Sequence, residues 1–306
     1  MKEILQTEIN YNNGLRTIKL VFKQPLMTTS ILSPEQITKI FPHSLRAILL
    51  SSDRLLAQLK ELDIDKDYHF DIGSLFLHMM DETFQQSYKT FIMSYEESSA
   101  TYKNLLKDNK EFKKFIETSS KKETNNHTLE DYLISIVQRI PQYITLLSSL
   151  SLCNPSTSQN HDTILKALNK TKEVAEQINR EEKLKLTKKL HIQLGIKEED
   201  IPPERILVHE ETVYRDVPPK KKSELANFEP KFKMYIFNDT IALSKMEQNE
   251  LRGVKFFYPP STSLSAQEHE EAAIKLSSGR SLHSTIYYCR SKVAQQSIID
   301  SLKLCL

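Results

Sequence analysis

Residues 129–147 read LEDYLISIVQRIPQYITLL and decide how the rest of the chain is interpreted. Apolar residues recur there at positions 129, 133, 136, 137, 140, 143, 144 and 147, the spacing that lines one face of a helix. The polar pair Gln138 and Arg139 lies within this pattern, and Pro141 follows two residues later. Because proline lacks an amide hydrogen and clashes with the preceding turn, we expect a kink or break between Ile136 and Ile140. A polar pair at a break in a core helix indicates a role other than packing.

The composition is that of a globular protein without a strong charge field. Of 306 residues, 27% are charged and 39% hydrophobic, and the formal net charge is +2, so nucleic acid is not an expected partner. None of the three cysteines lies near another and the histidines show no ligand spacing, so we expect neither disulfides nor a metal. No phosphate-loop or paired-acid pattern predicts a cofactor or hydrolytic chemistry. Without a signal peptide or membrane-span pattern, we expect a cytoplasmic protein.

The pattern of the chain changes near residue 190. Before it, helical spacing dominates and glycine is almost absent, which favours an elongated all-α helical bundle. After Pro202 and Pro203, strand-like runs occur at 205–214, 231–237, 240–245, 254–258, 272–276 and 284–289, and 292–306 reads as an amphipathic helix. We therefore predict a multidomain α-then-β chain. Residues 1–190 form the helical domain, and 191–306 form a small antiparallel β-sandwich or barrel capped by a C-terminal α-helix.

Several short motifs resemble, in order, those of the Dbl family of guanine nucleotide exchange factors, in which a Dbl-homology domain precedes a pleckstrin-homology domain. Residues 133–147 are similar to the family's third conserved region, whose common form begins Leu-Ile-Lys-Pro-Val-Gln-Arg-Ile. Residues 6–15, QTEINYNNGL, resemble the start of its first conserved region, and YIFND at 235–239 resembles a strand turn of the second domain. The resemblance covers nearly the whole chain and implies the same two-domain fold.

The resemblance also implies a function. Such a protein stimulates GDP release from, and GTP loading of, a Rho-family small GTPase by remodelling its two switch segments, without covalent chemistry or a catalytic nucleophile. Whatever the factor gains on the nucleotide-free GTPase is lost by the bound nucleotide, so the nucleotide-free form should be the preferred partner. The resemblance places Glu8 against switch 1, where a carboxylate accepts charge-assisted hydrogen bonds, and Asn179 against switch 2. Taken alone, each reads as a solvated helix residue.

Polar residues of the broken helix complete the expected GTPase-binding set. Ser135 stands where the family has a lysine that contacts switch 2, so we expect a weaker contact there. Arg139, next to Gln138, orients Glu8 or another acid, bonds a backbone carbonyl, or forms a structural ion pair within the bundle. His127 lies where family members choose among Rho-type partners, and its alternative is a loop histidine without a role.

A basic group marks the first strand-to-strand loop of the predicted β domain. Related domains bind phosphoinositides at this loop, and each basic residue near an anionic surface adds about 1 kcal/mol. The resemblance thus implies a phosphoinositide membrane surface as a second partner, with recruitment to the inner face of the plasma membrane. A solvated loop is the alternative. The group comprises Arg215, Lys220, Lys221, Lys222, Lys231 and Lys233.

Two departures from the family pattern keep another function open. Ser135 and Ile136 replace a lysine and a proline, which is compatible with a non-catalytic scaffold that combines a degenerate exchange domain with a membrane- or protein-binding β domain. The first motif begins almost at Met1, so we expect this sequence to be a fragment of a longer protein.

Overall fold

The chain forms two compact units, Met1–Ile178 and Asn179–Leu306, which divide within one long helix. The computed structural model describes residues 1–61, 71–123, 127–154, 156–158, 160–215, 231–247, 250–257, 262–265, 273–278 and 284–305. The predicted order, a helical part followed by an antiparallel sheet and a C-terminal helix, is confirmed. The expected domain boundary at residue 190 lies within the same helix, α10, which extends to Gln193 and contributes residues to both units.

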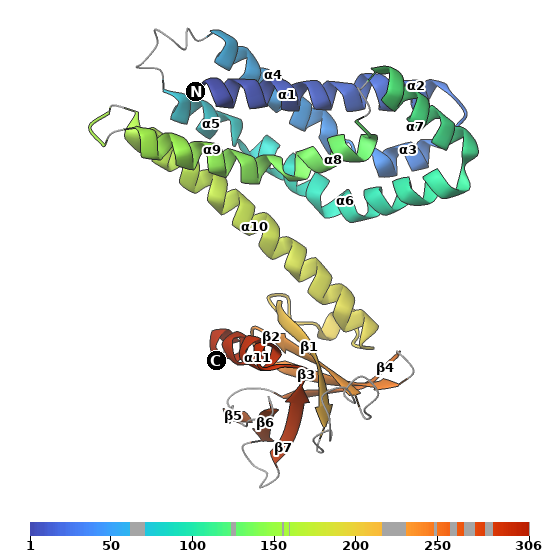
Figure 1. Cartoon of the computed structure of the whole chain (residues 1–306), viewed down its shortest axis with the longest axis vertical. Helices are drawn as coiled ribbons and strands as arrows, with labels where there is room; N and C mark the ends of the chain where they lie inside the picture. The colour runs from blue at the N-terminus through green and yellow to red at the C-terminus, as the bar shows by residue number, and fades with distance from the viewer. Residues whose placement is uncertain are drawn as a thin grey trace. The chain divides into compact units, whose positions relative to one another are not determined.

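The first unit is a bundle of helices packed around one hydrophobic core (Figure 1). Helix α1 contacts α4 as well as α8 and α9, so that more than one of its faces is covered. Its helices are α1 (Lys2–Thr17), the π-helix η1 (Ile18–Lys23), α2 (Gln24–Thr28), α3 (Pro34–Ile40), α4 (Ser44–Glu61), α5 (Ile72–Met79), α6 (Glu82–Asp108), α7 (Lys110–Glu123), α8 (Leu129–Val137), α9 (Arg139–Cys153) and the first part of α10 (His161–Gln193).

Local sequence signals explain where several of these helices begin. Ser33 caps α3, and its side chain and that of Gln36 satisfy each other's backbone amides, with Pro34 at the first helical position. Thr128 and Asp131 form the same reciprocal arrangement at the start of α8. The cap formed by Thr128 and Asp131 therefore fixes where the helical stretch of residues 129–147 begins.

In its described residues, the second unit is a seven-stranded antiparallel sheet with a helix packed on it (Figure 1). Helix α11 (Lys292–Cys305) contacts β1, β2 and β7, and its Ile298 and Leu302 join the sheet's core. Strand β5 was not predicted, because its sequence, TSLS, is short and polar. The strands, in the order β4-β3-β2-β1-β7-β6-β5, are β1 (Leu207–Arg215), β2 (Lys231–Phe237), β3 (Ile241–Glu247), β4 (Glu250–Phe257), β5 (Thr262–Ser265), β6 (Ala273–Ser278) and β7 (Ser284–Cys289).

None of the helices in the described part of the chain combines the length and the apolar character that crossing a bilayer requires.

Candidate functional site

The predicted break in the decisive stretch is present at Gln138. Helix α8 ends at Val137, Gln138 takes φ −79° and ψ −8°, and α9 begins at Arg139. Pro141 consequently falls in the first turn of α9, where a missing amide hydrogen removes no intrahelical bond.

A buried tyrosine from α6 completes the hydrogen bonding at this break. The Tyr88 hydroxyl donates to the carbonyls of Ile136 at 2.7 Å and Val137 at 2.8 Å. It also accepts a hydrogen bond from the Ile140 amide at 3.4 Å. Burial raises the pKa of Tyr88, so that it keeps the proton it donates. The break is therefore an ordered joint with its own hydrogen-bond partner, rather than a loosened helix.

Glu8 lies beneath this joint, entirely shielded from solvent. Its carboxylate accepts hydrogen bonds from the hydroxyls of Ser52 at 2.5 Å and Tyr143 at 2.7 Å, and from the guanidinium of Arg139. Burial raises the pKa of Tyr143, and the charge of Glu8 raises it further, so the phenol remains a donor. A carboxylate with these partners has its charge satisfied inside the protein rather than offered at the surface.

Arg139 is the positive member of this buried pair and is only 1% exposed. It donates to Glu8 and to the side-chain oxygen of Gln142, and its guanidinium carbon lies 4.8 Å and 4.2 Å from the ring centroids of Tyr11 and Tyr143. Burial alone would lower the pKa of Arg139, but Tyr143 and Glu8 outweigh this effect and raise it. Of the alternatives that the sequence left open, the structure shows an ion pair between Arg139 and Glu8 within the bundle.

The network continues along α1 to its other side. The Asn12 amide donates to Ser52 at 3.2 Å and to Asp53 at 2.7 Å. Arg16 donates to Asn12 at 2.9 Å and to Asp53 at 2.7 Å. A chain of polar contacts therefore runs from the solvent-exposed Arg16, through Ser52 and Glu8, to Arg139 and Gln142.

A groove of about 520 Å³ lies above the Arg139 side of this network. We call it the α1–α8 groove. Tyr11 and Gln142 both line it and both contact Arg139, so the buried pair supports its floor. A Cβ atom added at Gly14 would lie 3.1 Å from the Tyr132 ring, so glycine permits the close approach of α1 and α8. The lining residues are Thr7, Asn10, Tyr11, Gly14, His127, Asp131, Tyr132, Ser135, Gln138 and Gln142.

Three of the predicted GTPase-binding residues share this groove. Gln138 and His127 are exposed, and the His127 ring lies 5.9 Å from the Tyr132 ring. Ser135 is half-buried and lines the groove, so it can be reached from there. Its hydroxyl donates to the Tyr132 carbonyl at 2.7 Å. Asn179 is exposed on α10 directly after Ile178, the last residue of the first unit.

Sequence reasoning missed the partners that hold the site together. Tyr143 could have been found, because it lies four residues after Arg139 and shares its helix face, and the spacing of Glu8, Asn12 and Arg16 marks a polar line along α1. No signal in the sequence points to Ser52, and none places Tyr88 at the break between α8 and α9; both residues come from other helices.

The predicted lipid-binding residues are only partly described. Lys220, Lys221 and Lys222 lie outside the described residues. Arg215 is exposed at the end of β1, and Lys231 at the start of β2 pairs in register with Tyr214, so both flank the same connection. Lys233 forms an ion pair with Glu210 at 3.3 Å.

Comparisons with known proteins bear on the first unit in particular. Residues 1–179 match the RhoGEF domain family. Human Protein ECT2 is 31% identical over 188 residues, which cover 60% of this chain and 20% of that protein. Rac guanine nucleotide exchange factor B of Dictyostelium discoideum is 27% identical over 292 residues, covering 84% of this chain and 24% of that protein. The chain thus spans about a quarter or less of each relative.

Solved structures share the fold of both units. The DH/PH fragment of PDZRHOGEF, crystallised in complex with human RhoA, aligns with a TM-score of 0.80 at 14% identity, covering 99% of this chain and 92% of that chain. The linker-DH/PH domains of p115-RhoGEF align with a TM-score of 0.73 at 17% identity, covering 99% and 95%.

Proposed function

Because the chain belongs to the RhoGEF family, we propose that it acts as a guanine nucleotide exchange factor on a Rho-family small GTPase. The observation that carries the proposal is the α1–α8 groove, which lies within the matched region and collects Ser135, Gln138 and His127 over a rigid polar floor. PDZRHOGEF, a neighbour in fold, was crystallised with RhoA, which supports this class of partner.

The groove offers groups that suit the binding of a mobile polypeptide segment. The side chains of Gln138, Gln142 and Asn10 can donate and accept hydrogen bonds to backbone groups. The Tyr11 side chain lines the groove, and its ring contacts the guanidinium of Arg139 beneath it. Contacts made only to the nucleotide-free GTPase would lower the affinity of the GTPase for nucleotide by the same factor, without any covalent step.

Glu8 and Arg139 belong to this site as positioning residues. The Glu8 carboxylate would have to give up Ser52, Tyr143 and Arg139 before it could bind a switch segment. Its internal contacts instead hold Arg139 against Tyr11 and Gln142, which face the groove. Asn179, which is exposed on α10, is proposed separately as a direct switch 2 contact.

The deciding experiment measures release of fluorescent GDP from a panel of Rho-type and Rac-type GTPases. Acceleration with at least one GTPase is expected, and Gln138→Ala and Asn179→Ala should each lower the rate roughly tenfold or more, as expected for lost hot-spot contacts. Gln86→Ala and Asn104→Ala remove the same side chains from exposed sites on α6 and should leave the rate unchanged. If no GTPase responds but some are still bound irrespective of their nucleotide, the chain is a scaffold instead.

We propose in addition that the β1–β2 connection binds anionic phosphoinositide headgroups and recruits the protein from the cytoplasm to the inner face of the plasma membrane. Arg215 and Lys231 at the two ends of this connection support the proposal, together with the sequence of Lys220, Lys221 and Lys222 between them. Replacing those three lysines by alanine should weaken binding to phosphoinositide vesicles by about 1 kcal/mol per residue. The matched control is Lys110→Ala, Lys113→Ala and Lys114→Ala on α7, and equal loss in both triple variants would reject the site.

A further inference from the structure

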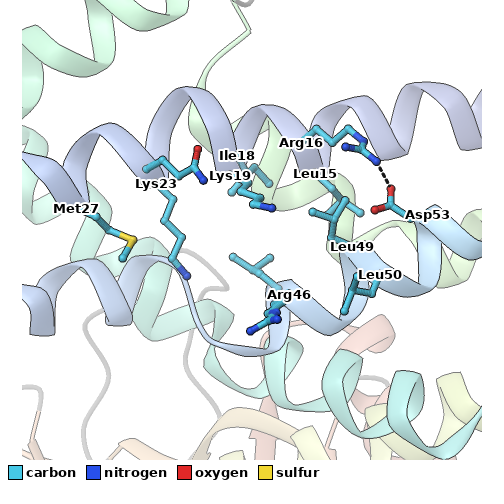
Figure 2. A pocket seen from close by; sticks show the side chains of 12 residues that line it. Leu15, Arg16, Ile18, Lys19, Lys23, Met27, Arg46, Leu49, Leu50 and Asp53 are labelled. Carbon is cyan, nitrogen blue, oxygen red and sulfur yellow. Dashed lines mark hydrogen bonds and ion pairs between the residues drawn. The ribbon is translucent and has the colours of Figure 1, made fainter.

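A second groove lies on a different face of α1 from the α1–α8 groove, between α1–η1–α2 and α4, with a volume of about 480 Å³ (Figure 2). We call it the basic groove. Its floor is apolar, with Leu15, Leu45 and Leu49 largely buried, while Met27 and Leu50 at its border are 63% and 47% exposed. Apolar surface that is rimmed by polar residues is a common feature of interaction sites.

Positive charge surrounds this floor. Figure 2 shows Lys19 and Lys23 extending from the helix on one side and Arg46 from the helix opposite. Asp53 is the acidic residue of the lining, and it is engaged by Arg16 at 2.7 Å. Neither Lys19 nor Arg46 forms an ion pair with another residue in the described ranges, so these charges are not compensated within them.

The backbone at this groove departs from an α-helix. Residues 18–23 form a π-helix between α1 and α2. Because hydrogen bonds in a π-helix join residues five apart, Ile18 and Lys23 align on one face and both line the groove. Burial lowers the pKa of Lys23, whose ammonium donates to the Phe41 carbonyl at 3.3 Å. A carboxylate placed here would meet an ammonium that is already partly removed from water.

We propose that the basic groove binds an acidic peptide segment carrying bulky apolar side chains. Its carboxylates would pair with Lys19, Lys23 and Arg46, while a leucine-sized side chain would enter between Met27 and Leu50. A recess between two helices, apolar at its floor and charged at its rim, is the geometry in which amphipathic helices are bound. A flat bilayer surface would reach the rim charges but not the recessed leucines, so the geometry favours a peptide over a membrane.

The basic groove also meets the buried network, because Arg16 belongs to both. A carboxylate that draws Arg16 away from Asp53 would disturb the contacts of Asn12 and, through Ser52, those of Glu8. Peptide binding should therefore alter the α1–α8 groove on a different face of α1. This coupling rests on the proposed exchange function, whereas peptide binding itself does not.

Binding is tested by fluorescence anisotropy with a labelled helical peptide of glutamates and regularly spaced leucines. Two matched peptides replace every glutamate by lysine or every leucine by serine, and both should bind roughly tenfold or more weakly. The variant Lys19→Glu/Arg46→Glu should lose a similar factor, whereas Lys110→Glu/Lys113→Glu on α7, with the same change in charge, should not. Equal binding of the lysine peptide would overturn the proposal. The proposal would also be overturned if the unchanged protein bound anionic vesicles but no peptide, and if Lys19→Glu/Arg46→Glu lost the vesicle binding. The groove would then be a lipid site.

Coupling is measured as the ratio of GDP-release rates with and without saturating peptide. Coupling is supported if this ratio differs from one by about twofold or more, which corresponds to roughly 0.4 kcal/mol. The ratio should return to one in Lys19→Glu/Arg46→Glu. A ratio of one with bound peptide rejects the coupling alone. Failure of every GTPase to respond without peptide would count against the proposed function, not against the groove.

Discussion

Glu8 and Arg139 carry opposite charges at a depth where solvent reaches neither side chain. A buried ion pair adds little net stability, because desolvation offsets the attraction, but removal of one partner leaves an uncompensated charge. The pair therefore acts less as a source of stability than as a constraint on how α1 and α9 must meet.

This constraint predicts a characteristic pattern among variants. Glu8→Leu and Arg139→Met should each lower the free energy of unfolding by about 3–5 kcal/mol, whereas the double variant Glu8→Leu/Arg139→Met should lose less than either single change. Urea denaturation measures all three, with Glu117→Gln on the exposed face of α7 as the control. Additive losses in the double variant would show that the two side chains do not act as a pair.

The sequence predicted which residues matter at this site better than it predicted their burial and their contacts. Arg139 was expected to orient an acid, to bond a backbone carbonyl or to form an ion pair, and it forms an ion pair with Glu8. Glu8 was expected to face a partner, but the periodicity of α1 cannot reveal that α4 covers one side of this helix while α8 and α9 cover another. Burial of a charged residue depends on contacts across 131 positions of sequence, which no local pattern contains.

Among the helices, the α8–α9 joint is the element that fixes the α1–α8 groove. Tyr88→Phe removes the donor to the Ile136 and Val137 carbonyls and should lower stability by about 1–3 kcal/mol, because buried acceptors are left unsatisfied. Pro141→Ala restores an amide hydrogen near Val137, so it should reduce this loss when combined with Tyr88→Phe. Thermal unfolding measures both, with Tyr95→Phe on the same helix as the control. A loss that Pro141→Ala leaves unchanged would mean that Tyr88 acts by packing alone.

Two helical glycines provide a matched test of close helix packing. A Cβ atom at Gly73 would lie 2.3 Å from the Thr163 backbone, whereas one at Gly14 would meet the movable Tyr132 ring at 3.1 Å. Gly73→Ala should therefore destabilise the first unit by about 3 kcal/mol. Gly14→Ala should change stability by less than about 1 kcal/mol, since the better helix propensity of alanine offsets a small ring shift. Chemical denaturation compares them, and equal losses would contradict this account.

Element boundaries were predictable wherever the local chemistry was specific. Proline after a polar pair located the joint at residues 136–140, and Ser33 with Pro34 located the start of α3. The π-helix was not predicted, because residues 18–23 carry the same apolar spacing as the α-helix before them. Strand β5 was missed for the opposite reason, since it lacks an apolar pattern and is defined by its pairing with β6.

Across the whole molecule, the two units have separate cores and should respond differently to acid. In the second unit, His191 is buried at the end of α10, where its Nδ1 donates to the Thr187 carbonyl at 2.8 Å and its Nε2 lies 3.5 Å from the Arg205 guanidinium. Burial lowers the pKa of His191 below its ordinary value of 6.5, although Asp239 and the Thr187 carbonyl act in the opposite direction. A proton added to this ring would sit beside a second cation.

The sign of the pH effect follows from this lowered pKa. Just below pH 6.5 the unfolded chain binds a proton at residue 191 that the folded chain does not, so stability of the second unit should fall as the pH drops below that value. Urea unfolding at about pH 7.5 and about pH 5.5, with proteolysis of the second unit as the readout, measures the effect. His191→Asn should reduce the difference and His43→Asn should not. A difference that persists in His191→Asn would assign the pH effect to other groups.

The distance between Glu8 and Arg139 along the chain also governs how the protein is made. Ribosomes add roughly 5–20 residues per second, so about 7–26 seconds separate the synthesis of Glu8 from that of the arginine 131 positions later. During that interval α1 has no positive partner for its carboxylate and cannot take its final place. Helix α1 emerges from the ribosome before the other helices of its bundle, yet it must be among the last elements of that bundle to complete its contacts.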